Sequence, residues 1–399
     1  MKKLLLLGGT RYLVPVIESA KEMGIYTITC DYLPNNIAHK YSNEYHNVSI
    51  VETDKVLALA ESLHIDGVMS FACDPGVVPA AYVADKLDLP MPGPFNSVAL
   101  LQNKGSFRAF LTEHGFNVPK ASSFQSTDSV VDKIQDFQFP VIVKPTDSAG
   151  SKGVSKVMER EQLDAAIKRA LSASRKGEFI IEEFIESKGF SSDSDCFSVD
   201  GELKFTSFSS QRFDAAAENP YTPAAYSWPS SMTKEQEQYL SGEIQRLIRL
   251  LHMQSSIYNV ETRIGTDGKP YIMEVSPRAG GNRLSEMLHY ATGTDLVKKS
   301  IQAALGEPID SSFSNELNGY WSEVILHADQ AGVYQNVWVS DSIQRNVVET
   351  DIWISKNDRV PAFRAANDAI GTLVMRFDEQ GEMSHVMDHF SEYVKVIVN

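Results

Sequence analysis

Two glutamates, Glu261 and Glu274, lie in alternating segments on either side of the dipeptide Asp267-Gly268. An Asp-Gly pair between such segments is the strongest short-range signal for a β-hairpin. If this dipeptide supplies the two turn residues, Thr266 pairs with Lys269 and Glu261 faces Glu274 directly. Because like charges opposed on neighbouring strands destabilise a hairpin, the pattern predicts a divalent cation bound by carboxylate oxygens.

Polar and glycine residues follow the second glutamate and extend this candidate site. Ser276 projects from the same face as Glu274, since side chains alternate along a strand. Residues 277–283 then add two arginines and a Gly-Gly pair. The alternative interpretation is an ordinary hairpin whose glutamates lie on its solvated face, and the rest of the chain must decide between the two.

A second candidate site follows a strand that ends in a lysine. Residues 139–144 form a predicted strand ending at Lys144, and residues 147–153 form a loop of small residues. Backbone amides of such a loop can approach a phosphate closely. It is not a Walker A loop, because no Gly-Lys-Ser/Thr opens a helix there. A flexible loop without a ligand is the alternative.

The elements that must position these residues begin with a βαβ series. Strand and helix patterns alternate over residues 1–92, which predicts a parallel sheet with crossover helices. The glycines at 8 and 9 follow the first strand, but the dinucleotide fingerprint lacks its remaining glycine. A ligand at the carboxyl ends of these strands stays open, with Gly9, Asp31 and Asp74 as the candidates.

Further along the chain, residues 96–115 are predicted to be helical and include Asn103-Lys104. Residues 179–185 are a strand with acidic residues in its second half, and residues 212–231 lack periodicity and are predicted to form a long functional loop. From residue 319 onward, short alternating segments predict an antiparallel closing sheet.

The composition excludes several classes of protein. The chain has 399 residues, enough for about two or three domains. A net charge of −15 argues against general nucleic-acid affinity, and no apolar stretch is long enough to predict a membrane span. Cys30, Cys73 and Cys196 have neither disulfide nor metal-ligand spacing, so a reducing cytoplasm is the expected location.

Taken in order, these motifs resemble the ATP-grasp superfamily across essentially the whole chain. The residues that carry the resemblance are Asn103-Lys104, the 140–145 strand, the glycine- and serine-rich loop, the 182–185 segment, Glu261, Glu274 and Arg278. Residues 276–282 and 288–295 are similar to carboxylate-amine ligases, including L-amino acid ligases and purine-pathway enzymes of the carbamoyl phosphate synthetase-like branch.

The resemblance implies an α/β fold with a parallel-sheet domain, a two-part ATP-grasp fold and a C-terminal antiparallel sheet. The expected boundaries are 1–92 for the N-terminal domain, 93–121 for a helical linker, 122–185 for a small lid subdomain, 186–310 for the central subdomain and 311–399 for the β-rich C-terminal subdomain.

The resemblance also implies a role for each matching residue. Lys104 and Lys144 would contact the phosphates of ATP, and Glu182 would bind the adenine amino group. The residues implied to cover the phosphates are Ser148, Gly150, Ser151 and Gly153, and those implied to line the adenine slot are Glu183, Phe184, Ile185 and Met273.

Two Mg²⁺ ions, or Mn²⁺ in their place, would be bound by Glu261 and Glu274. Ser276 would be a further ligand, although family members commonly have Asn there. Gly189 stands where an acidic ribose contact is usual, which leaves Glu186 or Asp193 for that role. The implied catalytic residues, which would stabilise an oxyanion, are Arg278, Gly281 and Asn282.

The chemistry implied is a two-step ligation of a small carboxylate to an amine through an acyl phosphate, with an amino acid or dipeptide ligase as one form. Two alternatives remain: an enzyme that phosphorylates bicarbonate or formate, and a regulatory ATP-binding protein without turnover. A homodimer is among the assemblies that the resemblance allows. Arg212, Arg263, Arg283, Tyr226 and Trp228 are open between substrate contact and packing or ion pairing, and His289 is expected to be packed.

Overall fold

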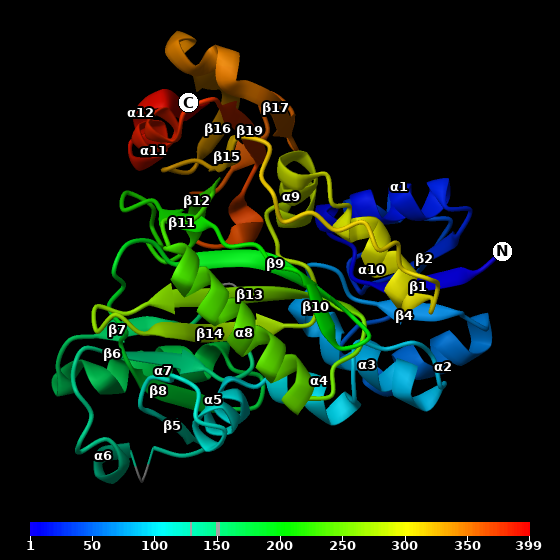
Figure 1. The fold of residues 1–399 in the computed structure, drawn as a ribbon, viewed down its shortest axis with the longest axis horizontal. Helices are drawn as coiled ribbons and strands as arrows, with labels where there is room; N and C mark the ends of the chain where they lie inside the picture. The colour runs from blue at the N-terminus through cyan, green and yellow to red at the C-terminus, as the bar shows by residue number, and fades with distance from the viewer. Residues whose placement is uncertain (128–129, 149–151) are drawn as a thin grey trace.

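The computed structural model describes residues 1–127, 130–148 and 152–399 (Figure 1). It begins with a parallel four-stranded sheet in the order β3-β2-β1-β4, as the βαβ pattern predicts. The strands are β1 (Lys3–Leu7), β2 (Tyr26–Cys30), β3 (Glu44–His46) and β4 (Gly67–Met69), and the helices are α1 (Val14–Glu22), α2 (Thr53–Leu63) and α3 (Asp74–Lys86). The sequence analysis missed β3, because its three residues are too few to show a pattern.

Two helices follow where one was predicted, α4 (Phe95–Leu101) and α5 (Lys104–Glu113). The break falls at Asn103, whose side chain accepts a hydrogen bond from the Ser106 N–H at 2.9 Å and so caps α5. Lys104 is therefore the first residue of a helix rather than an interior one.

A four-stranded antiparallel sheet, called the lid sheet here, has the order β5-β8-β6-β7. Its elements are β5 (Ala121–Phe124), α6 (Val130–Lys133), β6 (Val141–Pro145), β7 (Ser155–Val157), α7 (Leu163–Ala173) and β8 (Phe179–Glu183). Val141, Val143 and Ile181 pack with α7 in one core. Because side chains alternate along a strand, Lys144 and Glu182 project from the opposite face.

The central sheet has the order β10-β9-β13-β14. Its elements are β9 (Ser192–Val199), β10 (Glu202–Phe205), α8 (Lys234–Leu250), β13 (Ser256–Ile264), β14 (Pro270–Ser276), α9 (Leu284–Thr292) and α10 (Leu296–Ala304). A capping box, in which Thr233 and Gln236 exchange hydrogen bonds, starts α8. Its apolar face packs on this sheet, and Figure 1 shows α8 crossing it.

The β13–β14 hairpin differs from the prediction at its tip. Gly265 pairs with Lys269, so the turn has three residues and not the expected two, and Thr266 does not face Lys269. Gly268, with φ of 80°, takes the left-handed conformation that this turn requires. A bulge at Met273 shifts the register back, and Glu261 faces Glu274 as predicted.

The C-terminal sheet has the order β11-β12-β15-β19-β17, and a smaller sheet has the order β18-β16-β20. The elements are β11 (Ser210–Phe213), β12 (Pro223–Trp228), β15 (Tyr320–Leu326), β16 (Gly332–Val339), β17 (Val347–Ile352), β18 (Arg359–Val360), β19 (Gly371–Phe377), α11 (Gln380–Asp388), α12 (Phe390–Tyr393) and β20 (Val394–Val398). The prediction of a long loop over residues 212–231 is wrong, because β12 and the end of β11 lie within this range.

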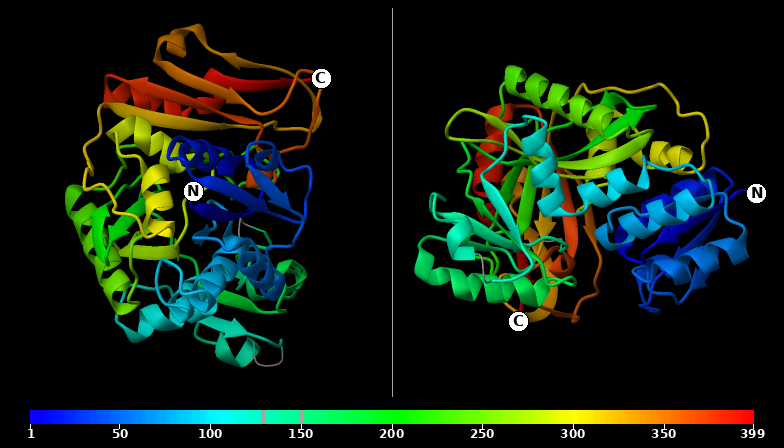
Figure 2. Two further views of the ribbon diagram at one scale, coloured as in Figure 1. Left: turned by 90° about the vertical axis from the view of Figure 1, so that its right-hand side faces the viewer. Right: turned by 90° about the horizontal axis from the view of Figure 1, so that it is seen from below.

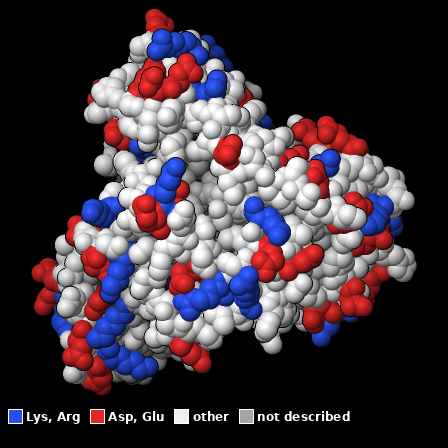
Figure 3. Space-filling model, in the orientation of Figure 1, with Lys and Arg blue, Asp and Glu red and all other residues white. Residues whose placement is uncertain are grey.

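The N-terminal sheet and the C-terminal sheet lie on two sides of the central sheet, and the lid sheet lies on a third (Figures 1 and 2). Acidic and basic side chains are interspersed over the face shown in Figure 3. Within the described part of the chain, no helix has the length and apolar character needed to cross a membrane.

Candidate functional site

Three acidic side chains form a row across the central sheet. Glu261 on β13 is paired in register with Glu274 on β14 and with Asp193 on β9. Burial, with the charge of Glu261 next to it, raises the pKa of Asp193 to about 7. Asp193 entered the sequence analysis only as a ribose candidate, although the alternation Ser-Asp-Ser-Asp over 192–195 places it on one face with Asp195.

A second polar row lies beside the first, with Asp195, Asn259 and Ser276 in register. Asn259 Nδ2 donates to Asp193 Oδ1 at 2.6 Å. Asp195 is completely buried and accepts from the Gly280 N–H at 2.7 Å. Burial raises the pKa of Asp195 to about 6 against the opposing effect of its hydrogen bonds. The second row therefore binds the 277–283 loop through Asp195.

Lys104 reaches the acidic row from the start of α5. Its Nζ lies 3.2 Å from Glu274 and donates to the Ser148 carbonyl at 3.1 Å. Burial alone would lower the pKa of Lys104, but the charge and hydrogen bond of Glu274, together with the charges of Asp74 and Glu261, outweigh it and the pKa is raised. In Glu274, the effect of burial is likewise outweighed by Lys104 and Lys144, and its pKa is lowered. Lysine and carboxylate are thus both charged at this position.

Lys144 and Glu182 form a buried ion pair with Arg108 of α5. Arg108 Nε lies 3.0 Å from Glu182 Oε2, and Lys144 binds the other oxygen. Burial would raise the pKa of Glu182, but Arg108 and Lys144 lower it to about 2. Both carboxylate oxygens are therefore occupied by cations of the chain, and the adenine contact proposed for Glu182 remains a prediction. Arg108 was missed, because nothing local in α5 indicates a partner on β8.

Arg278 connects the central sheet to the N-terminal sheet. Its Nε and Nη2 donate to the two carboxylate oxygens of Asp74 at 2.9 and 2.8 Å, and its Nη1 donates to Asn259 at 2.9 Å. Ser276 Oγ donates to Asp74 at 3.1 Å and accepts from Gln102 at 2.7 Å. Asp74 begins α3 beyond the carboxyl end of β4, so this end of the parallel sheet supports the loop.

The remaining residues of the implied catalytic set lie in the same loop. Asn282 has a left-handed backbone, with φ of 54°. Its amide accepts from the Tyr12 hydroxyl at 3.2 Å and donates to the Tyr226 hydroxyl at 3.3 Å. Gly281 is half-buried, with open space where a Cβ would lie, so a substrate group has room beside its backbone.

The segment implied to line the adenine slot is half-buried at the end of β8. The N–H groups of Glu183 and Phe184 donate to the backbone carbonyls of Lys120 and Pro140, respectively. The Ile185 carbonyl accepts a hydrogen bond from Arg263 at 2.9 Å. Lys156 Nζ lies 3.8 Å from the centre of the Phe184 ring. Met273 is the half-buried residue at the β14 bulge.

The glycine- and serine-rich loop is described only at its ends. Ser148 contributes its carbonyl to Lys104, and Gly153 is left-handed with φ of 72° and packs closely on α7. Gly150 and Ser151 lie outside the described residues. Gly189 is also left-handed and Glu186 is exposed, which leaves the ribose contact open.

The other candidates are placed as follows. Arg283 pairs with acids of α9 and β17, and Arg212 pairs with Asp388 at 2.9 Å. Tyr226 and Trp228 are buried on β12. His289 is exposed, so the expectation that it is packed is wrong. It lies one residue away from the buried face of α9 that contains Leu288.

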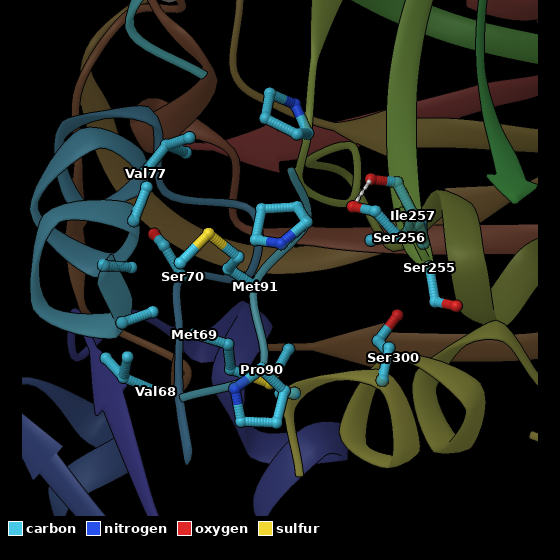
Figure 4. Close-up of a pocket in the computed structure, with 17 residues that line it drawn as sticks. Val68, Met69, Ser70, Val77, Pro90, Met91, Ser255, Ser256, Ile257 and Ser300 are labelled. Carbon is cyan, nitrogen blue, oxygen red and sulfur yellow. Dashed lines mark hydrogen bonds between the residues drawn. The ribbon is translucent and has the colours of Figure 1, made fainter. Parts of the chain in front are cut away.

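Two cavities lie away from these rows. The apolar cavity in Figure 4 has a volume of about 60 Å³ and lies where the N-terminal sheet meets β13 and α10, which is too small for a nucleotide. A cleft of about 1080 Å³ between α5 and the lid sheet includes Arg108, Thr146 and Lys176. Its lining does not include Lys104, Lys144 or the acidic row.

The carboxylates of the acidic row fit divalent cations. Lys104 pairs with Glu274, and Arg263 lies 3.8 Å from Glu261. Asp193 lies beside Glu261 in register, so three carboxylates share two cations on a partly buried surface. Oxygen ligands of this kind are what Mg²⁺ and Mn²⁺ prefer. Within the described ranges, another set of three potential ligand atoms lies close together beyond the ends of β11 and β15. These atoms belong to Asp214, His327 and Asp329 and lie within 4.8 Å of one another.

Residues 137–286 match the family model of the ATP-grasp domain. The carbamoyl phosphate synthase large chain of a Thermoanaerobacter species is 21% identical over 62% of this chain and 22% of its own length. The chain spans about half the length, or less, of three curated relatives with significant matches.

Two solved structures share the fold. The L-amino acid ligase from Bacillus licheniformis superposes with a TM-score of 0.80 at 19% identity over 100% of this chain and 99% of that one. The biotin carboxylase domain dimer of Hydrogenobacter thermophilus 2-oxoglutarate carboxylase, in complex with MgADP, ADP and bicarbonate, has a TM-score of 0.75 at 17% identity over 100% and 91%.

Proposed function

We propose that this chain, which contains an ATP-grasp domain, is an ATP-dependent carboxylate-amine ligase. The observation that carries the proposal is the convergence of two half-buried lysines with a row of acids. Lys104 and Lys144 come from α5 and the lid sheet, and Glu261 and Glu274 come from the central sheet. Phosphoryl transfer needs positioning and charge neutralisation more than covalent catalysis, and this arrangement supplies both.

In this proposal the triphosphate of ATP lies between the lid sheet and the central sheet. Lys104 and Lys144 contact its phosphates, and Glu261 and Glu274 hold Mg²⁺, with Asp193 and Ser276 beside them. The metal supplies Lewis-acid stabilisation of the transferring phosphoryl group. Lys104 binds Glu274 at 3.2 Å, so its charge is already positioned before the nucleotide binds.

Arg278 orients the substrate carboxylate and stabilises the oxyanion of the second step. Its guanidinium is held in one plane by the two oxygens of Asp74 and by Asn259. The amides near Gly281 lie in the same loop. A bound carboxylate therefore meets a fixed, buried charge, which needs little rearrangement during the reaction.

A second candidate is phosphorylation of bicarbonate. It is supported by the similarity to a carbamoyl phosphate synthase chain and to a carboxylase domain crystallised with bicarbonate. The positive charge of Arg278 suits either anion, since both are planar and carry negative oxygens.

Phosphate release measured over a matrix of carboxylates and amines tests the proposal. Ligation predicts release that needs ATP, Mg²⁺ and both partners. Release with bicarbonate alone supports the second candidate, and nucleotide binding without release under any pair contradicts both.

The proposal also covers domain boundaries, cellular location and assembly. We predict domain boundaries at residues 92, 121, 185 and 310, a cytoplasmic location and a homodimer. The dimer is supported by the assembly named for the Hydrogenobacter carboxylase domain, and light scattering after size-exclusion chromatography checks it.

A further inference from the structure

The C-terminal sheet contains a completely buried acid, Glu323, on β15. Neither of its carboxylate oxygens has a hydrogen-bond partner among the residues that the structure describes. Buried polar groups are almost always paired in folded proteins, and an unpaired carboxyl group is destabilising. Glu323 therefore points to a partner that the chain itself does not supply.

The neighbours of Glu323 in the sheet define which way it faces. It is paired with Tyr226 on β12 and with Val374 on β19, and Val374 is paired in turn with Glu349 on β17. Paired residues in adjacent strands project from the same face. Glu323 and Glu349 thus share the face that packs toward α9 (Figure 1).

This face has more acid than base. Arg283, at the start of α9, is shared by Glu286 at 2.9 Å and Glu349 at 3.0 Å, and it donates to Thr372 at 3.0 Å. Burial raises the pKa of Glu323, and Glu286 and Glu349 raise it further against the charge of Arg283. Arg283 also lies 3.5 Å from Asp351, so three acids engage this arginine. Within the described part of the chain, neither oxygen of Glu323 has a hydrogen-bond partner.

A set of hydrogen-bonded side chains lies beside this acidic cluster and extends to the proposed reaction site. Tyr226, next to Glu323 in the sheet, accepts from Asn282 at 3.3 Å and donates to Asp193 at 3.3 Å. Tyr12 donates to Asn282 at 3.2 Å, and its ring meets Trp353 edge to face at 5.9 Å between centres. Arg11 lies 5.6 Å from the centre of the Trp353 ring, so this ring already holds a cation of the chain. Aromatic rings beside carboxylates are surroundings that bind organic cations.

We propose that the acidic cluster of Glu286, Glu323 and Glu349 binds a positively charged nitrogen group of a substrate, an alkylammonium or a guanidinium, and that Glu323 determines this specificity. Such a group has several N–H donors for the two unpaired oxygens. The side chains of Glu286 and Glu349 are 24% and 28% exposed, so solvent reaches the edge of the cluster.

This inference rests on the proposed ligase function, because that function places a substrate beside Asn282. The cation has two sources. It is either the α-ammonium group of an amino acid whose carboxylate is phosphorylated, or a group on the amine that attacks the acyl phosphate. The same three acids would serve in both cases, and matched probes separate them.

The experiment measures the midpoint of thermal unfolding and the dissociation constant by calorimetry, with no ATP present. The probes are L-norleucine, hexanoate, which lacks its ammonium group, and pentylamine, which lacks its carboxylate. The proteins are the wild type, Glu323→Gln, Glu323→Met as a second variant, and Glu202→Gln as a control, since Glu202 is an exposed acid on β10.

We expect Glu323→Met to unfold at a higher temperature than the wild type without a probe, because an unpaired buried polar group is removed. Binding of the cationic probe should weaken by about tenfold or more, the size of one charge-assisted hydrogen bond. Glu202→Gln should bind as the wild type does. Binding of L-norleucine alone assigns the cation to the carboxylate substrate, and binding of pentylamine assigns it to the amine.

Equal binding of hexanoate and the cationic probes, no binding of either cationic probe to the wild type, or unchanged binding by both Glu323 variants overturns the proposal. Because the assay uses no nucleotide, its result is independent of phosphate release. Loss of the ligase proposal and loss of this inference are therefore distinguishable.

Discussion

Replacing Arg108 with methionine tests the buried charge cluster at the proposed nucleotide site. Glu182 is almost fully buried and has a pKa of about 2 against an ordinary value of 4.5. This difference corresponds to about 3 kcal/mol of stability at neutral pH. Arg108 and Lys144 share the effect, and the charge of Arg108 is the larger of the two charge effects, so Arg108→Met should lower the free energy of unfolding by about 2 kcal/mol.

The pH dependence gives this prediction its sign. The folded pKa of Glu182 lies below its unfolded value, so the stabilisation is present above pH 4.5 and is lost as pH falls toward 2. Urea unfolding should therefore show a loss at pH 3 that is less than half the loss at pH 7. Arg249→Met is the control, because the Arg249–Glu202 pair is more than half exposed on both sides and should contribute little. An equal loss in both variants, or a loss independent of pH, would refute the reasoning.

Three further predictions concern the reaction site. Glu274→Gln should keep the fold and lower turnover by about 100-fold or more, because phosphoryl transfer loses a metal-binding charge; phosphate release measures this, and normal turnover contradicts it. Arg278→Lys should lower kcat by about tenfold, because lysine cannot bind Asp74 with two parallel hydrogen bonds, and steady-state kinetics checks it. Burial raises the folded pKa of Asp195 from 3.8 to about 6, so its stabilisation is full below pH 3.8 and is lost as pH rises through 6. Asp195→Asn should therefore gain about 2 kcal/mol relative to the wild type between pH 4 and 7 in urea unfolding, and a constant difference would be evidence against this.

The sequence predicted what depends on local pattern. Glu261 and Glu274 face each other because both flank one turn, and the bulge at Met273 offsets the extra turn residue. The acidic row needed a third strand, and the order of strands in a sheet is not a local property. For this reason Asp193 was not recognised as the third member.

Contacts between distant segments were not predictable. Arg108 and Glu182 are 74 positions apart, and Asp74 and Arg278 are 204 apart. Strand β12 was missed for a different reason: nearly all of its residues are buried, so it lacks the alternation of polar and apolar residues that identifies a half-exposed strand.

The central claim is that a substrate carboxylate receives the γ-phosphoryl group of ATP at the site formed by Lys104, Lys144 and the acidic row. The most direct test uses a carboxylate substrate labelled with ¹⁸O in both oxygens, chosen from the active pair in the phosphate-release matrix. An acyl phosphate that breaks down by amine attack transfers one labelled oxygen to each inorganic phosphate, which mass spectrometry detects. The account predicts this transfer, and unlabelled phosphate from turnover of the same substrate would contradict it.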